Sequence, residues 1–361
     1  MKIVIVGAGV AGLSIGWRLA AAGAEVTILE RAQPGRGATW ASAGMISTTA
    51  ETGESVRAEA DFAKHSARMW PHFAREIEEA SGIDVGYRVD GTLIVARSAD
   101  EAAALSARAK GSPALEFLVP DGARALEPLL APDILGALYD PDEAHVDNRA
   151  LGIALTVAFR RAGGNLQTNE AVVRFDIYDG RVIGALTPFA LHKADAFILA
   201  AGAWSGQIDG LPPEIVPPIV PVKGEMIALD PIGAALPKHV IWGNGVYLVP
   251  RRGRLLVGAT VSRDGFDSRP RAAAAQWLFD RAATVLPALT DWTLAEHWAG
   301  LRPGSPDDLP VLGRSAVENL FIASGQFRNG ILFAPAIADL MFRLVMKGEA
   351  ELESFSPLRF C

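Results

Sequence analysis

A strand–helix–strand pattern opens the chain. Apolar residues 3–6 predict a buried strand, helical periodicity continues to Ala22, and Gly23 ends that helix. A second apolar run over residues 25–29 predicts another strand. This order is typical of a βαβ unit with parallel strands, and it predicts that the chain begins with an α/β domain.

A long helix is predicted over residues 54–81, where apolar residues recur at helical spacing. Pro71 lies inside this segment and is expected to kink or divide the helix, because proline removes a backbone donor. Ser98 is followed three residues later by Glu101. This spacing forms a capping box and predicts a helix that continues to Lys110.

The segment around that capping box departs from the βαβ pattern and mixes short strands with helices. Residues 87–97 predict two short strands that meet at the turn dipeptide Asp90-Gly91. A helix over residues 121–130 and a strand over residues 134–139 follow. This mixture predicts a second domain of α+β type.

The βα pattern then returns. Asp147 is predicted to cap a helix that ends at Arg161, and residues 172–186 form a predicted hairpin around an Asp-Gly turn. Residues 194–199 predict a further buried strand. Later segments predict the strands of an antiparallel sheet over residues 222–228, 240–242, 246–249, 255–261 and 293–298, with a helix over residues 272–286. The βα pattern then returns once more, with a strand over residues 320–323 and a helix over residues 334–347.

The alternation of βα segments with α+β segments predicts two domains, each built from separate pieces of chain. The predicted fold class is a Rossmann-type FAD- or NAD-binding α/β domain with an inserted antiparallel-sheet domain of α+β type. The nucleotide-binding domain is expected to take residues 1–84, 145–215 and 312–361. The inserted domain, which would bind the substrate, is expected to take residues 85–144 and 216–311.

The turn after the first strand carries a G-x-G-x-x-G motif. Gly7 permits the tight turn, Gly9 lets the backbone approach a pyrophosphate, and Gly12 lets the helix pack against the strand. The helix N-terminus offers N–H groups to the phosphates. Glu30 follows the second strand, where an acid accepts hydrogen bonds from ribose hydroxyls. The motif predicts dinucleotide binding and does not by itself separate FAD from NAD.

Composition narrows the function classes. The chain has 361 residues, of which 50% are hydrophobic, and its formal net charge is −7 without a run of basic residues. Nucleic acid is therefore an unexpected partner. Cys361 is the only cysteine, which excludes an internal disulfide and favours a cytoplasmic location. No membrane span is expected, since charged residues interrupt the apolar segment at residues 330–346. No metal site is expected either.

Two arginines lie among glycines and apolar residues. Arg302 and Arg328 could each bind a substrate carboxylate, which guanidinium holds with two parallel hydrogen bonds. The alternative is a structural ion pair between domains. The small residues of segment 40–45 leave a similar choice between a wall for a flavin ring and a tight helix start without a ligand.

Several longer motifs carry a family resemblance. The pieces GAGVAG, ATWASAGM, VPVKGEM, YLVPR, WAGLRPGSPDDLPVLGR and ASGQFRNGILFAP extend over nearly the whole chain. They resemble the FAD-dependent amino acid oxidases of the D-amino acid oxidase superfamily, and most of all the glycine oxidases of thiamine biosynthesis (ThiO). The resemblance implies FAD as the cofactor and a flavin held between the two domains.

The resemblance also implies roles for individual residues. Arg302 would bind the amino acid carboxylate, Tyr247 would hydrogen-bond it, and Arg328 would lie near the substrate. Together with the glycine motif, the implied cofactor-binding set is Gly7, Gly9, Val10, Ala11, Gly12, Glu30, Arg31, Ala38, Thr39, Ala43, Gly44, Met45, Val172, Gly202, Gln326, Phe327, Arg328, Asn329, Gly330, Ile331 and Leu332. Two departures from the family are Trp40, where relatives carry a small residue, and residues 244–246, where some relatives carry a bulkier polar residue.

The implied reaction is the oxidative deamination of glycine, sarcosine or small D-amino acids. The Cα hydrogen passes as hydride to the flavin, water converts the imino acid to a 2-oxo acid and ammonia or an amine, and molecular oxygen yields hydrogen peroxide. The resemblance further implies a homo-oligomer, a homotetramer in glycine oxidases. Alternatives are a dehydrogenase of amino acids or secondary amines that uses another electron acceptor, and a non-catalytic flavoprotein.

Overall fold

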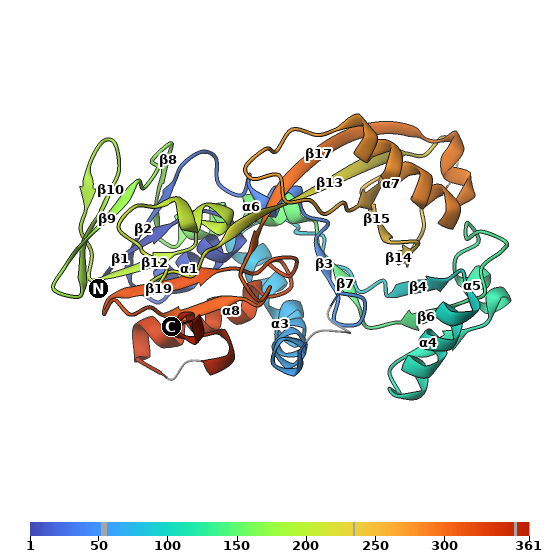
Figure 1. Cartoon of the computed structure of the whole chain (residues 1–361), viewed down its shortest axis with the longest axis horizontal. Helices are drawn as coiled ribbons and strands as arrows, with labels where there is room; N and C mark the ends of the chain where they lie inside the picture. The colour runs from blue at the N-terminus through green and yellow to red at the C-terminus, as the bar shows by residue number, and fades with distance from the viewer. Residues whose placement is uncertain (52–55, 234, 350–351, 361) are drawn as a thin grey trace.

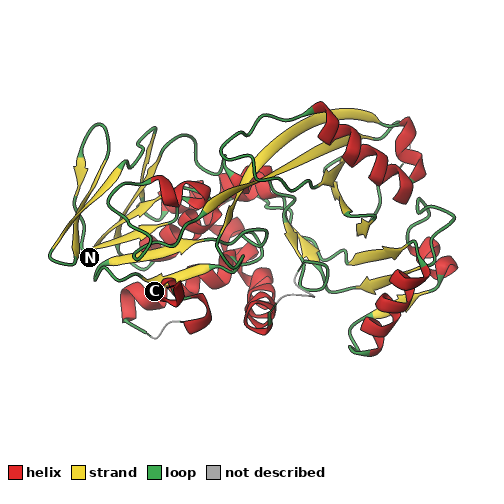
Figure 2. Cartoon of the chain, viewed as in Figure 1, coloured by secondary structure: helices red, strands yellow, loops and turns green. Residues whose placement is uncertain are grey.

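Two sheet-based bodies lie side by side in the computed structural model, which describes residues 1–51, 56–233, 235–349 and 352–360 (Figure 1). Both termini lie in the same body, which is built around a six-stranded sheet. The other body is built around an eight-stranded sheet. Helices lie against both sheets (Figure 2).

The six-stranded sheet contains the predicted βαβ unit. Strands β1 and β2 are parallel, and helix α1 (Val10–Ala21) connects them. All neighbouring pairs are parallel except β18 with β19. The order of the strands is β18 (Val311–Arg314), β19 (Leu320–Ser324), β12 (Ala196–Leu199), β1 (Lys2–Val6), β2 (Glu25–Glu30) and β8 (Asn165–Thr168). This arrangement confirms the Rossmann-type half of the predicted fold class.

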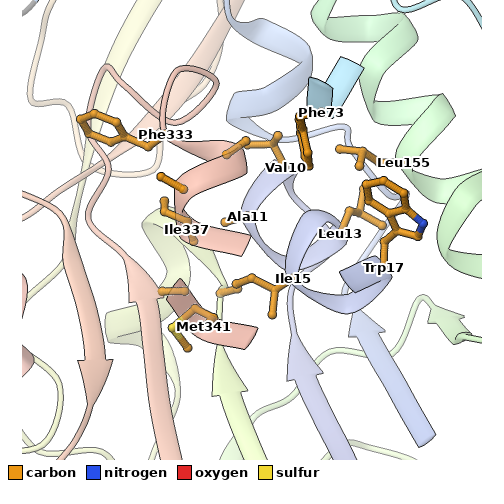
Figure 3. Packing of buried hydrophobic residues seen from close by; sticks show 14 of the residues in the cluster. Val10, Ala11, Leu13, Ile15, Trp17, Phe73, Leu155, Phe333, Ile337 and Met341 are labelled. Atoms are coloured by element: carbon orange, nitrogen blue, oxygen red, sulfur yellow. The ribbon is translucent and has the colours of Figure 1, made fainter. Parts of the chain in front are cut away.

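Helix α1 is buried almost along its whole length. It packs against α8 (Ala334–Phe342), which continues as a π-helical turn at Arg343–Lys347, and against α6 (Asn148–Arg161). Figure 3 shows side chains of these helices and of α3 (Arg57–Ser81) meeting in one apolar cluster, which includes Leu13, Ile15, Trp17, Phe73, Leu155, Ile337 and Met341. One carboxylate oxygen of Asp147, Oδ1, accepts from Arg149 N and Ala150 N and caps α6 as predicted.

The sequence predicts that Pro71 kinks or divides its helix. Helix α3 runs unbroken through Pro71, so the second possibility, a division into two helices, is wrong. Pro71 is exposed, while Trp70 and Phe73 beside it are buried in the apolar cluster. The indole Nε1 of Trp70 donates to Leu332 O at 3.0 Å. Packing of the apolar stripe therefore holds the helix together across the missing backbone donor. The predicted start at residue 54 lies outside the described residues.

The eight-stranded sheet supplies the antiparallel part of the fold. Its order is β17 (Thr293–Gly304), β13 (Val220–Asp230), β16 (Arg254–Gly258), β15 (Val246–Arg251), β14 (Val240–Gly243), β4 (Thr92–Ala96), β6 (Gly136–Asp140) and β5 (Glu116–Leu118). Only β14 and β4 pair in parallel within it. The strands come from both segments of the predicted inserted domain, whose exact boundaries stay a prediction.

The predicted hairpin over residues 87–97 does not form. Its second half is strand β4, which pairs with β6 and β14, while Arg88 pairs with His145 elsewhere. Gly91 separates the two halves at φ +76°, and its N–H donates to Glu143 O at 3.0 Å. The Asp-Gly dipeptide therefore redirects the chain between two sheets, and the prediction of paired strands is wrong.

Smaller elements complete the two bodies. The capping box of Ser98 and Glu101 is present at α4 (Ala99–Lys110), as predicted. Helix α5 (Pro120–Leu126) is shorter than predicted, and α7 (Ala272–Val285) packs on β13 and β15. The remaining elements are α2 (Ala38–Ala41), β3 (Met45–Ile46), β7 (Ala144–His145), β9 (Arg174–Tyr178), β10 (Arg181–Leu186), β11 (Leu191–His192) and 3-10 turns at Gly202–Gln207, Pro287–Asp291, Glu353–Phe355 and Pro357–Phe360.

Gly12→Ala tests the packing of α1 on β1. Alanine normally stabilises a helix interior relative to glycine by about 1 kcal/mol. Here a Cβ would stand 2.0 Å from Gly7 O. We therefore expect the opposite sign, a loss of about 2–4 kcal/mol in the free energy of unfolding, because the backbone must shift. Urea denaturation measures the loss, and Gly111→Ala, where the nearest atom would lie at 3.5 Å, is the matched control. Equal stability of Gly12→Ala and the parent protein would contradict this account.

Candidate active site

A cavity of about 530 Å³ lies where the carboxyl ends of β1, β2 and β12 meet β13, β15 and β17. Three segments line most of it: the turn between β1 and α1, residues 29–47, and the loop after β19. Every residue of the predicted cofactor-binding and catalytic sets lines this cavity except Gly12. Gly12 instead faces Gly7, where its lack of a side chain lets α1 approach β1.

The glycine turn leaves its backbone open to the cavity. Gly7 has φ +102°, and a Cβ there would stand 2.5 Å from Ala200 O. A Cβ on Gly9 would meet only Thr39 Oγ1, at 3.6 Å. Gly9 is also the N-cap of α1 and has no side chain to cap the helix. The positive end of α1 therefore faces open space, which suits a phosphate group.

Glu30 lies at the end of β2 beside this turn. One carboxylate oxygen accepts from Ala8 N at 2.8 Å and the other from Ala32 N at 2.9 Å. These bonds hold the side chain in place. A carboxylate oxygen has more than one acceptor site, so both oxygens keep capacity for hydroxyl donors such as those of a ribose.

The small residues after α2 form a wall of the cavity that is anchored from behind. Gly44 has φ +75°, and a Cβ there would stand 2.0 Å from Val146 O. The guanidinium of Arg251 donates to Ala43 O at 2.7 Å. Asn148 Nδ2 donates to the carbonyls of two residues of α2, both at 2.9 Å. Hydrogen bonds therefore fix this wall, in which backbone and small side chains predominate.

Trp40, the departure from the family pattern, does not line the cavity. Its ring packs edge-on against Trp298 at 6.2 Å, and the Arg149 guanidinium lies 3.9 Å from its centroid. The indole of Trp298 donates to Ala41 O at 3.0 Å. The large side chain thus packs α2 against β17 and does not form part of the cavity wall.

Arg302 reaches the cavity from β17. A Cβ on Gly224, on the neighbouring strand β13, would stand 2.3 Å from the guanidinium, so the group lies flat on bare backbone. Its Nη1 donates to Thr260 O at 3.2 Å, with Lys223 O at 3.5 Å. Within the described ranges no carboxylate is ion-paired with Arg302. The structure therefore does not support the alternative of a domain–domain ion pair at this residue.

Tyr247 lies on β15 and faces the same space. Its hydroxyl donates weakly to Met226 Sδ at 3.8 Å. Burial raises the pKa of Tyr247, while the charges of Arg302 and Arg328 oppose the shift. The phenol is therefore a neutral hydrogen-bond donor beside two guanidinium groups.

Arg328 does form an ion pair, with a residue that the sequence pattern did not single out. Its Nε lies 2.9 Å from Oε2 of Glu51, and the Glu51 side chain is 8% exposed. Burial raises the pKa of Glu51, and Arg328 and Arg302 oppose that shift. Glu51 lies in a loop without periodicity, and only the fold brings it beside Arg328.

The loop that carries Glu51 is tied to the inserted sheet by acidic residues. The Glu143 carboxylate accepts from Ser47 Oγ at 2.7 Å and from Thr49 N at 2.5 Å. Thr49 Oγ1 donates to Asp140 at 2.6 Å. Burial raises the pKa of Glu143 to about 7. These contacts hold the loop at the edge of the cavity.

Comparison with known proteins identifies the family. A model of FAD dependent oxidoreductases (DAO) matches residues 2–344. This chain belongs to the DAO family of FAD dependent oxidoreductases. It is 36% identical to the glycine oxidase of Pseudomonas aeruginosa over 94% of each chain. The solved glycine oxidase of Geobacillus kaustophilus superposes with a TM-score of 0.92 and 32% identity over 99% of each chain.

Other relatives of this DAO-family chain are longer. It is 33% identical to the bifunctional protein ThiO/ThiG of Trichormus variabilis over 99% of its own length. That alignment covers 55% of the relative, so the chain spans about half the length of these bifunctional proteins. No helix within the described residues is long and apolar enough to cross a membrane.

The cavity of this DAO-family chain fits FAD. The open backbone at Gly9 and the N-terminus of α1 suit the pyrophosphate, and Glu30 keeps acceptor capacity for ribose hydroxyls. The small residues Ala43 and Gly44 line the cavity and leave room for a ring system against the backbone. Val172 and Gly202 line the same cavity from β-strand ends on the other side.

Glu143→Gln tests the buried acid of the loop anchor. The pKa of Glu143 is raised from 4.5 to about 7 on folding, so the folded protein holds a proton that the unfolded chain releases. Stability is then lost as pH rises from about 4.5 through about 7, by about 3–4 kcal/mol in total. The variant lacks this loss, and thermal unfolding at about pH 5.5 and about pH 8.5 measures the difference.

The exposed Glu79 of α3 provides the control for this measurement, as Glu79→Gln. We expect the control to follow the parent protein at both pH values. Parallel stability profiles of Glu143→Gln and the parent protein would contradict the assignment of Glu143 as a desolvated acid.

Proposed function

We propose that this chain is an FAD-dependent amino acid oxidase of the glycine oxidase type. It would oxidise glycine, sarcosine or small D-amino acids to the 2-oxo acid, ammonia or an amine, and hydrogen peroxide, with molecular oxygen as acceptor. The names of its relatives support the substrate class. The observation that carries the proposal is the half-buried guanidinium of Arg302, which lines the cavity without a carboxylate partner among the described residues.

Arg302 would bind the substrate carboxylate with two parallel hydrogen bonds, because its planar fork matches a carboxylate. Gly224 supports this role, since a side chain there would occupy the place of the guanidinium. Tyr247 would donate a hydrogen bond from its hydroxyl to the same carboxylate, once a bound substrate replaces its weak contact with Met226. Two fixed donors of this kind orient Cα and restrict which of its faces meets the cofactor.

FAD, when bound, supplies the acceptor for the hydride that leaves the substrate Cα. The residues proposed to hold it are the glycine turn, Glu30, the wall at residues 38–45, and the loop at residues 326–332. The surrounding cavity would exclude bulk water from the reacting atoms. The hydride step needs no acid–base pair of this chain, and we assign none among the residues that line the cavity.

The chain would act as a homo-oligomer in the cytoplasm, and its reaction would belong to thiamine biosynthesis, as the name ThiO of its longer relatives suggests. The predicted boundaries at residues 84, 144, 215 and 311 would separate the FAD-binding domain from the substrate-binding domain. The choice of oxygen over another electron acceptor is decided by the second experiment below.

Arg302→Ala tests the carboxylate clamp. Loss of one partner of a hydrogen-bonded charge pair costs about 2–5 kcal/mol, so we expect kcat/KM for glycine to fall between about thirtyfold and about five-thousandfold. FAD should remain bound, because Arg302 lies at the substrate end of the cavity. Steady-state kinetics and the flavin spectrum measure both effects. Arg68→Ala, an exposed change on α3, is the control. Unchanged turnover in Arg302→Ala would overturn the assignment.

Anaerobic mixing tests the reaction type. We expect glycine, sarcosine or a small D-amino acid to bleach the flavin absorbance, and readmitted air to restore it with formation of hydrogen peroxide. Rapid-scanning absorbance and a peroxide assay record the two steps. Bleaching without recovery in air would contradict the oxidase and identify a dehydrogenase. Absence of bleaching with all of these substrates would overturn the proposed function.

A further inference from the structure

Glu51 is an acid in a cavity that is otherwise suited to an anion. Its side chain is 8% exposed and lines the same cavity as Arg302 and Tyr247. Burial of a carboxylate costs free energy unless a charge and hydrogen bonds compensate it. The compensating partner is Arg328, whose Nε lies 2.9 Å from Glu51 Oε2. Binding a monocarboxylic amino acid requires no such acid.

The charges at the substrate end can be counted from these contacts. Arg302 and Arg328 bring two positive charges, and Glu51 brings one negative charge. Because Glu51 is paired with Arg328, the net charge that faces a ligand is that of one guanidinium, carried by Arg302. One carboxylate neutralises it. A second carboxylate on the same ligand would meet the Arg328 pair, where Glu51 repels it.

We propose that Glu51 is a specificity-determining residue that restricts this site to substrates with a single carboxylate. It does so by occupying Arg328, which would otherwise bind the second carboxylate of an amino or imino diacid. This inference rests on the proposed function, since it assumes that Arg302 holds the first carboxylate. It adds the exclusion of dicarboxylates, which is not a consequence of the carboxylate clamp alone.

Glu51→Gln tests the exclusion by ligand binding, without turnover. Acetate carries one carboxylate and succinate carries two, and neither has an amine to oxidise. Titration of the FAD-loaded protein, followed by the shift in flavin absorbance, gives the two dissociation constants. We expect the preference for succinate over acetate to rise about tenfold or more in Glu51→Gln, because Arg328 becomes free for the second carboxylate.

A second variant isolates the route of the effect. If Glu51 acts through Arg328, the double variant Glu51→Gln/Arg328→Met loses the gain in succinate preference, and the two substitutions are not additive. Glu79→Gln is the control. Glu79 is an exposed acid of α3 that does not line the cavity. We expect this control to keep the ligand preference of the parent protein.

The pH dependence of ligand binding to the parent protein tests the inference without any substitution. Protonation of Glu51 removes the repulsion, so the preference for succinate should rise as pH falls while both succinate carboxylates stay ionised. The charged and titratable groups that face Glu51 are Arg328, Arg302, Tyr247 and Glu59. Burial raises the pKa of Glu51, which brings this change toward neutral pH. Glu51→Gln should not show this pH-dependent change.

Three outcomes overturn the inference and leave the proposed function intact. An unchanged succinate preference in Glu51→Gln would show that the acid does not exclude a second carboxylate. A gain that persists in the double variant would show that Arg328 is not the route. Weaker binding of glycine with unchanged binding of both acids would place Glu51 at the substrate amine. Conversely, the expected shift without flavin bleaching by any amino acid would support the ligand preference and overturn the oxidase.

Discussion

The cavity depends on backbone contacts that only glycine permits. Where β1 turns into α1, a Cβ on Gly7 would stand 2.5 Å from Ala200 O, and a Cβ on Gly12 would stand 2.0 Å from Gly7 O. These approaches bring α1 close to the carboxyl ends of β1 and β12. The N-terminus of the helix then faces the cavity, where its first N–H, that of Val10, donates to Thr39 Oγ1 at 2.9 Å. A helix N-terminus placed in this way is suited to a phosphate group without a basic side chain at the turn.

The same constraint shapes the part of the cavity beside Arg302. Gly224 and Gly300 lie opposite each other on β13 and β17. A Cβ on the first would stand 2.3 Å from the Arg302 guanidinium, and one on the second would stand 2.4 Å from Ala41 Cβ. The missing side chain at Gly224 thus leaves room for the flat guanidinium of Arg302, and the missing side chain at Gly300 leaves room for the short helix α2. Both ends of the cavity are built where side chains are missing.

Buried acids give the site its electrostatic character. Glu143 holds the loop at residues 47–49 through hydroxyl and backbone donors, and its carboxyl is desolvated enough to raise its pKa to about 7. Glu51, at the end of that loop, is held by Arg328. Such groups cost stability when ionised, so their positions are informative about ligand charge. The loop anchor and the cavity charge are therefore parts of one connected arrangement.

Local patterns in the sequence determined the βαβ unit, the glycine turn, the caps at Ser98 and Asp147, and most of the strands, because these depend on residues close together in the chain. Family motifs indicated which residues would gather at the cavity. Only the tertiary structure decided that α3 passes unbroken through Pro71 and that residues 87–97 do not form a hairpin. It also decided that Glu51 meets Arg328, since residues 277 positions apart share a contact only when the β19 loop and the residue 47–51 loop are packed against one cavity.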